Sequence, residues 1–318
     1  YLNSFFKYNF SISKGNIEDG YLLHSIIPLK TNSERILDIS EKDIYVSSAW
    51  WTADLGLRIL NEQNNFFKKD RKLIYLIQDF EPGFYPQGAT YAQAKATYQE
   101  SKKLIAIINS EELYNFFSNY FDFFKSYYVP FELNDKLSKE LKKYTNSSNQ
   151  IARKKIIICY GRPSTERNCF GTIVSGLKKW QDTTSSEVVK SWKIYFIGEK
   201  FDKNLISNLK NARVLNKLSL EEYALIMQKA KIGISLMESP HPSYPPIEMA
   251  SFGVKVLTNK YLQKDLSLRN KNIISLEKNT PDSLSKNLKE IIESDVIIND
   301  SELSIINAPY CEGKIFDS

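Results

Sequence analysis

Histidine and cysteine are scarce in the 318-residue sequence, which holds two histidines and three cysteines. His24 and His241 stand far apart, so no zinc ligand set can be assembled from their spacing. Cys159, Cys169 and Cys311 form no CxxC pair, and Cys159 lies in an apolar run, which predicts a buried free thiol. The sequence therefore disfavours a zinc protein and a disulfide-stapled secreted domain.

Long apolar runs and the common phosphate-binding fingerprints are also missing. No apolar stretch approaches the length of a membrane span, and no signal-peptide pattern is present, so we expect a cytoplasmic protein. Neither a GxGxxG nor a GxxxxGK[ST] motif occurs, which disfavours dinucleotide-binding and P-loop sites. The formal net charge of +6 favours an anionic partner such as a nucleotide phosphate. It leaves peripheral contact with the inner face of a membrane open, whereas no motif supports nucleic acid as a partner.

Short apolar runs alternate with amphipathic stretches along the chain. The predicted strands are 44–47, 72–77, 104–108, 126–129, 155–160, 193–197, 232–236 and 255–258. The predicted helices are 53–61, 91–101, 111–119, 169–180 and 220–229. Strands rich in Val, Ile and Leu that alternate with helices are typical of parallel sheets covered on both faces. We therefore predict an α/β fold with two Rossmann-like, doubly wound lobes that face a central cleft.

A polar stretch rich in lysine and asparagine, residues 134–154, interrupts the alternation. We place the boundary between the lobes there, which gives residues 1–150 and 151–318. Packing of the C-terminal segment back on the first lobe is compatible with this division.

The segment after the predicted strand 155–160 carries a candidate phosphate site. Gly161 permits a close turn, Arg162 and Arg167 offer planar donors suited to phosphate, and Asn168 is expected to cap the following helix. In open α/β sheets, ligands bind beyond the carboxyl ends of the strands. The alternative is two surface arginines in a polar turn.

A second cation stands in the same kind of place. Lys217 precedes a helix whose start is marked by Ser219 and Glu222, the pattern of a capping box. A phosphate or a nucleotide base is the expected partner of Lys217, although a lone lysine is weak evidence.

A proline-rich loop, Met237 to Gly253, follows the predicted strand 232–236. Pro246 suits the first turn of a helix that would carry Glu248, whose carboxylate can accept ribose hydroxyls. The alternative role of Glu248 is to interact with the helix dipole.

Three segments resemble the WsaF-type rhamnosyltransferases of bacterial surface glycans: LIQDFEPGFYP, GRPSTERN and SPHPSYPPIEMASFG. The resemblance extends from about Ile44 to Asn259. It implies a metal-independent glycosyltransferase of GT-B fold without a cofactor, whose donor is dTDP-L-rhamnose and whose acceptor is a glycan or lipid-linked glycan. It also implies that the first lobe binds the acceptor and the second binds the nucleotide sugar.

The resemblance also assigns roles to single residues. It implies that Glu248 binds the ribose, that Tyr244 lies beside the nucleotide, and that Arg162, Arg167 and Lys217 hold the diphosphate. The wider retaining GT-B families carry two glutamates separated by seven residues in this loop. Glu248 matches the second of them, but Pro240 stands at the first position, so the carboxylate usually placed near the donor sugar is missing.

The candidate acceptor residues follow two strands of the first lobe. Asp79 lies just after the strand 72–77 and is our candidate for the catalytic or acceptor-orienting acid, the alternative being a carboxylate that caps its own turn. Ser48, Trp50 and Trp51 follow the strand 44–47 and are candidates for an acceptor platform, since aromatic faces stack on sugars. Tryptophans in such a place also serve as core residues.

The sequence leaves the stereochemical outcome open. In a retaining front-face reaction the departing phosphate takes the acceptor proton, whereas in an inverting reaction Asp79 serves as the general base. Two alternative functions are a metal-dependent GT-A transferase that uses Asp79-Phe80-Glu81 as a variant Asp-x-Asp site, and a two-lobed sugar-binding protein without enzymatic activity.

Overall fold

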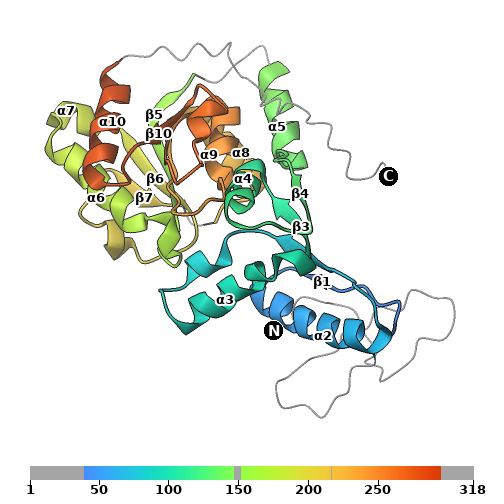
Figure 1. Cartoon of the computed structure of the whole chain (residues 1–318). Helices are drawn as coiled ribbons and strands as arrows, with labels where there is room; N and C mark the ends of the chain where they lie inside the picture. The colour runs from blue at the N-terminus through green and yellow to red at the C-terminus, as the bar shows by residue number, and fades with distance from the viewer. Residues whose placement is uncertain (1–38, 147–151, 216, 295–318) are drawn as a thin grey trace.

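A computed structural model describes residues 39–146, 152–215 and 217–294 of the chain. Its strands form two parallel sheets with separate hydrophobic cores. In Figure 1 the four-stranded sheet lies at the lower right and the six-stranded sheet at the upper left. The predicted α/β architecture with two lobes is confirmed.

The first sheet has the strand order β1–β2–β3–β4, and all of its neighbours are parallel. Its strands are β1 (Val46–Ser47), β2 (Leu73–Ile77), β3 (Leu104–Asn109) and β4 (Lys125–Val129), and its helices are α2 (Trp50–Phe67), α3 (Ala89–Gln99) and α4 (Glu111–Tyr120). Alternate residues of β2 and β3 are buried, as the two-residue period of a strand requires when one face is covered. Within the described residues this strand order never reverses direction.

The second sheet has the order β10–β9–β8–β5–β6–β7 and is also parallel throughout. Its strands are β5 (Lys154–Gly161), β6 (Lys193–Gly198), β7 (Ala212–Val214), β8 (Ala230–Ile234), β9 (Lys255–Asn259) and β10 (Ile273–Leu276). Its helices are α6 (Phe170–Asp182), α7 (Ser186–Ser191), α8 (Leu220–Lys229), α9 (Tyr244–Ser251) and α10 (Pro281–Glu293). The order reverses between β5 and β8, as in a Rossmann fold, and this reversal places a ligand crevice beyond the carboxyl ends of those two strands.

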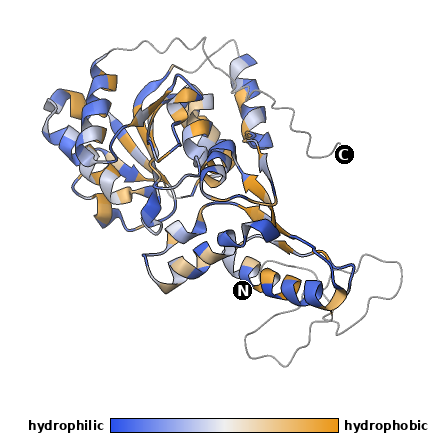
Figure 2. Ribbon diagram, in the orientation of Figure 1, coloured by the Kyte–Doolittle hydropathy of each residue, from blue (hydrophilic) through white to orange (hydrophobic). Residues whose placement is uncertain are grey.

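Both faces of the second sheet are covered. Ile157 and Cys159 of β5 belong to one hydrophobic cluster, while Ile156 and Ile158 belong to the cluster on the other side. Figure 2 shows apolar residues along the strands between more polar helix surfaces. Cys159 is fully buried and free, which confirms the prediction for this thiol.

The predicted strands and helices are all present, although one strand is shifted. The strand predicted at 232–236 runs from Ala230 to Ile234, and the short strands β7 and β10 and the helices α5, α7 and α10 were missed. The described part of the chain also contains five short 3₁₀ turns: Glu81–Phe84, Ser101–Lys103, Glu166–Asn168, Lys203–Ile206 and Leu266–Leu268. None of the helices in the described ranges is long and apolar enough to cross a membrane.

The polar stretch 134–154 contains a helix, α5 (Asp135–Asn146), where the sequence predicted only an interruption. Leu137, Leu141 and Tyr144 are buried at helical spacing, and Leu137 and Leu141 join the core of the second sheet. In this packing α5 belongs with the second sheet although it precedes residue 150. The division at residue 150 falls in 147–151 and the C-terminal segment begins at 295, so both lie outside the described residues and stay predictions.

Candidate functional site

A cavity of about 590 Å³ lies where the carboxyl ends of β2 and β3 face the loops that follow β5 and β8. Seven of the predicted site residues line it: Asp79, Arg162, Arg167, Asn168, Lys217, Tyr244 and Glu248. They come from both lobes and from segments separated by up to 169 positions in the chain. The tertiary structure therefore gathers residues that the sequence could only place at separate strand ends.

Arg167 is the central cation of this cavity. Its guanidinium lies over the ring of Phe84 from the first lobe, 4.1 Å from the ring centroid. Its Nε atom is buried without a hydrogen-bond partner in the described chain, and Asp79 Oδ2 lies 3.7 Å away. A buried guanidinium nitrogen with no hydrogen-bond acceptor is a costly arrangement.

Arg162 and Lys217 line the same cavity as Arg167, but their side chains are held less firmly. Arg162 Nε lies 3.7 Å from Glu199 Oε2, so a half-buried carboxylate already neutralises part of its charge. Lys217 precedes α8, whose capping box is present: Ser219 Oγ accepts from Glu222 N at 3.2 Å, and Glu222 Oε2 accepts from Ser219 N at 2.8 Å. The prediction of this helix start is confirmed.

Asn168 lines the cavity but does not cap the following helix. The N-cap of α6 is Cys169, which has the left-handed φ of 52° and makes no side-chain cap hydrogen bond. Asn168 instead ends the 3₁₀ turn Glu166–Asn168 and is buried. The expected capping role was wrong because this extra turn delays the start of the helix by one residue.

Glu248 lies on α9, and Pro246 stands in the first turn of that helix, as predicted. Burial raises the pKa of Glu248 from 4.5 to about 7, and the nearby Tyr223 hydroxyl opposes part of this rise. A carboxylate that is poorly solvated in the empty cavity gains most when a ligand brings hydroxyl donors to it.

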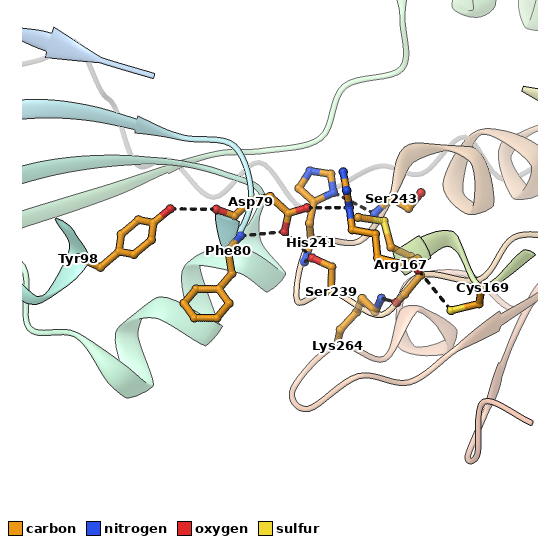
Figure 3. A network of polar contacts seen from close by, with 10 residues as sticks. Asp79, Phe80, Tyr98, Arg167, Cys169, Ser239, His241, Ser243 and Lys264 are labelled. Atoms are coloured by element: carbon orange, nitrogen blue, oxygen red, sulfur yellow. Dashed lines mark hydrogen bonds and ion pairs between the residues drawn. The ribbon is translucent and has the colours of Figure 1, made fainter. Parts of the chain in front are cut away.

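Asp79 follows β2 and is buried between the lobes (Figure 3). Its Oδ1 atom accepts from Phe80 N at 2.8 Å and from the hydroxyl of Ser239, which belongs to the second lobe. Among the described residues, Oδ2 has only the ion pair with Arg167. Asp79 therefore contacts the main chain of its own loop through Oδ1, although the 3₁₀ turn that follows has no side-chain cap, and Oδ2 accepts no hydrogen bond from the described residues.

The loop between β8 and α9 places His241 against the same cavity. Its main-chain N–H donates to Ser239 Oγ at 3.1 Å, and its Nδ1 accepts from Ser243 N at 3.1 Å. Burial is the largest cause that lowers the pKa of His241, while Asp79 acts in the opposite direction. Lys264, fully buried beneath the loop, donates to the carbonyl of Met237 at 2.7 Å, and burial lowers the pKa of Lys264 to about 8.

Tyr244 joins the lobes on the other side of His241. Its hydroxyl donates to Asn109 Oδ1, at the end of β3, at 2.8 Å. Its ring lies 5.1 Å from that of Phe131 and 5.2 Å from that of His241. Tyr244 is thus held in place before any ligand binds.

The three predicted acceptor residues do not line the cavity. Ser48 is exposed, and Trp50 and Trp51 form the first turn of α2. Trp50 Nε1 donates to Tyr85 Oη at 3.0 Å and its main-chain N–H donates to Glu81, so it supports the loop after β2. Trp51 is 57% exposed, and its ring meets the Trp50 ring edge to face with the centroids 6.0 Å apart. Their acceptor role stays a prediction.

Sequence reasoning missed several residues of the site. Ser239, His241, Asn109 and Tyr223 were not predicted to act there, because only the fold brings their side chains to the other residues. A polar residue at the end of a buried strand, such as Asn109 in β3, was the available signal. In the described ranges no group of three or more His, Cys, Asp or Glu side chains is arranged to hold a metal ion.

Two family models match the chain. The model "WsaF, C-terminal domain" matches residues 155–289, and "WsaF, N-terminal domain" matches residues 1–111. The chain belongs to the WsaF family. This WsaF-family chain is 24% identical over 223 residues to the O-antigen biosynthesis protein RfbC of Myxococcus xanthus, which covers 68% of the chain but only 15% of that relative.

Solved structures share the fold of this WsaF-family chain at low identity. HepE of Anabaena, determined with UDP and glucose, gives a TM-score of 0.55 at 11% identity over 81% of this chain and 71% of that one. WaaG, described as a glycosyltransferase of lipopolysaccharide biosynthesis, gives 0.53 at 12% identity over 90% and 83%. The fold is GT-B, as predicted, which removes the GT-A alternative.

Proposed function

We propose that the protein is a glycosyltransferase that transfers L-rhamnose from dTDP-L-rhamnose to a glycan or lipid-linked glycan acceptor of the bacterial surface. The observation that carries this proposal is the gathering of three cations, Arg162, Arg167 and Lys217, in one cavity with Glu248. The WsaF family and the name of the Myxococcus relative support the surface-glycan acceptor.

The cations would stabilise the leaving dTDP. As the glycosidic bond breaks, negative charge grows on the diphosphate, and Arg162, Arg167 and Lys217 lie where that charge can be neutralised. Glu248 would accept the 3′-hydroxyl of the deoxyribose. The Oδ2 atom of Asp79, which is ion-paired with Arg167, would accept a hydrogen bond from the acceptor hydroxyl, either to orient that hydroxyl or to remove its proton.

Two routes for that proton follow from this arrangement. In a retaining reaction a phosphate oxygen of the departing dTDP takes it, and in an inverting reaction Asp79 takes it. The anomeric configuration of the product, read by NMR, distinguishes the routes.

A thermal-shift panel of dTDP, UDP and GDP with their sugars tests the proposal. A ligand at a hundred times its dissociation constant stabilises the folded protein by about 2.7 kcal/mol, which is a readable shift. We expect the largest shifts for dTDP and dTDP-L-rhamnose, followed by dTDP release when an acceptor glycan is added. A larger response to UDP or GDP sugars would refute the donor, and no response to any nucleotide would refute the function. A pure sugar-binding protein would respond to free sugar alone.

A further inference from the structure

The imidazole of His241 has its proton placed by the protein backbone. The main-chain N–H of Ser243, which follows His241 and Pro242, donates to Nδ1 of the ring at 3.1 Å. A nitrogen that accepts a hydrogen bond carries no proton, so the neutral ring bears its single proton on Nε2. His241 is therefore a hydrogen-bond donor at one defined atom.

The ring is also held neutral and in a fixed orientation. Burial lowers the pKa of His241, and the positive charges of Arg167 and Lys264 lower it further, against the opposing effect of Asp79. The ring meets Tyr244 edge to face at 5.2 Å, and Tyr244 is tied to Asn109 across the cleft. Nε2 has no hydrogen-bond partner among the described residues, and it is not sealed from the cavity that His241 lines.

The position of His241 in the cavity indicates which part of a ligand would accept a hydrogen bond from Nε2–H. Glu248 and Tyr223 interact with each other and form the end assigned to the nucleoside. His241 lies instead near Asp79 and Arg167, whose charges act on its pKa, at the end of the cavity next to the first lobe (Figure 3). Arg167 supplies the positive charge for the diphosphate at this end of the cavity. The neutral N–H of His241 beside the Asp79 carboxylate suits a sugar hydroxyl instead, because a hydroxyl can accept a hydrogen bond from the N–H and donate one to the carboxylate.

We infer that His241 Nε2–H donates a hydrogen bond to a hydroxyl of the transferred sugar, so that His241 is a specificity-determining residue for the donor. This inference rests on the proposed function. It places sugar recognition on an imidazole one residue after Pro240, in a loop that is fixed to the first lobe through Ser239 and Asp79.

Two substitutions test the roles of the two ring nitrogens separately. In His241→Asn the amide oxygen takes the place of Nδ1 and can still accept from Ser243, but nothing donates at the Nε2 position. In His241→Gln the amide nitrogen reaches the Nε2 position and restores the donor. Calorimetric titration with dTDP and with dTDP-L-rhamnose gives two dissociation constants for each variant, and a thermal melt confirms that each is folded.

We expect the ratio of the dissociation constant for dTDP-L-rhamnose to that for dTDP to rise about threefold to tenfold in His241→Asn, the effect of one lost neutral hydrogen bond. The dTDP constant itself should stay within twofold, and His241→Gln should keep the wild-type ratio. An unchanged ratio in His241→Asn, or an equal rise in both variants, overturns the inference while the proposed function stands. Failure of the wild-type protein to bind either compound overturns the proposed function and the inference with it.

Discussion

The Tyr244 hydroxyl of the second lobe donates a hydrogen bond to Asn109 Oδ1 of the first lobe at 2.8 Å. The two residues stand 135 positions apart in the chain, and both line the cavity. Together with the contact between Ser239 and Asp79, this bond fixes the distance between the segment that follows β8 and the strand ends of the first lobe.

The Tyr244–Asn109 bond predicts coupling between the two residues. In a double-mutant cycle of Tyr244→Phe and Asn109→Ala, the free energies of unfolding from urea titrations should show a coupling of about 1 kcal/mol, the usual net contribution of one hydrogen bond. The cycle of Tyr244→Phe with Arg58→Ala, an exposed arginine on α2, should be additive. An additive cycle for Tyr244 and Asn109 would show that this bond does not form in solution.

Removal of single cations should weaken dTDP binding to different degrees. Arg167→Ala should lose about tenfold to a hundredfold in affinity, since a charge-assisted hydrogen bond contributes about 1.5–3 kcal/mol. Arg162→Ala should lose less, because Arg162 is more exposed and already pairs with Glu199. Arg213→Ala removes an exposed arginine of β7 and should change nothing. Calorimetry measures all three, and an Arg167→Ala variant with wild-type affinity would remove this residue from the site.

Glu248 should make stability depend on pH. Because burial raises its pKa from 4.5 to about 7, the folded state holds the proton more tightly than the unfolded state, and stability falls as pH rises from about 4.5 to 7. Glu248→Gln should therefore raise the melting temperature of the ligand-free protein at pH 8 but hardly at pH 4.5, with an upper limit of about 3 kcal/mol.

The same variant should lose affinity for dTDP at pH 8, since the amide is a weaker acceptor for the sugar hydroxyl than the carboxylate. Glu187→Gln, an exposed position on α7, serves as the control for a change of net charge. An equal gain in stability from both substitutions, or an equal gain at both pH values, would contradict the assignment of the effect to the buried carboxylate.

Asp79 should act in the chemical step rather than in donor binding. Asp79→Asn should lower turnover by about a hundredfold or more, the usual contribution of a positioned acid or base, with dTDP affinity little changed. Ser239→Ala removes the hydrogen bond to Asp79 Oδ1 but leaves the charge, so turnover should fall far less. Equal losses in the two variants, measured as dTDP release in the presence of acceptor, would instead assign Asp79 to fixing the loop between the lobes.

The sequence by itself determined the alternation of strands and helices, because burial on one or both faces leaves a period that can be read locally. It also determined which charged side chains stand beyond the strand ends, because Asp79, Arg167 and Glu248 each lie in a segment that follows a predicted strand. Local signals failed where packing decided the element: α5 is mostly polar, and three buried side chains on one stripe hold it to the second sheet.

Only the tertiary structure decided which of these residues meet. Asp79 comes within reach of Arg167 and Ser239 because the carboxyl ends of β2 and of the second sheet point at the same cavity, and no pattern along the chain encodes that approach. The same holds for His241, whose neutral ring and single donor atom depend on burial and on the hydrogen bond from the Ser243 main chain. Residue types follow from the sequence, whereas hydrogen-bond partners and desolvation arise only when distant segments are packed together.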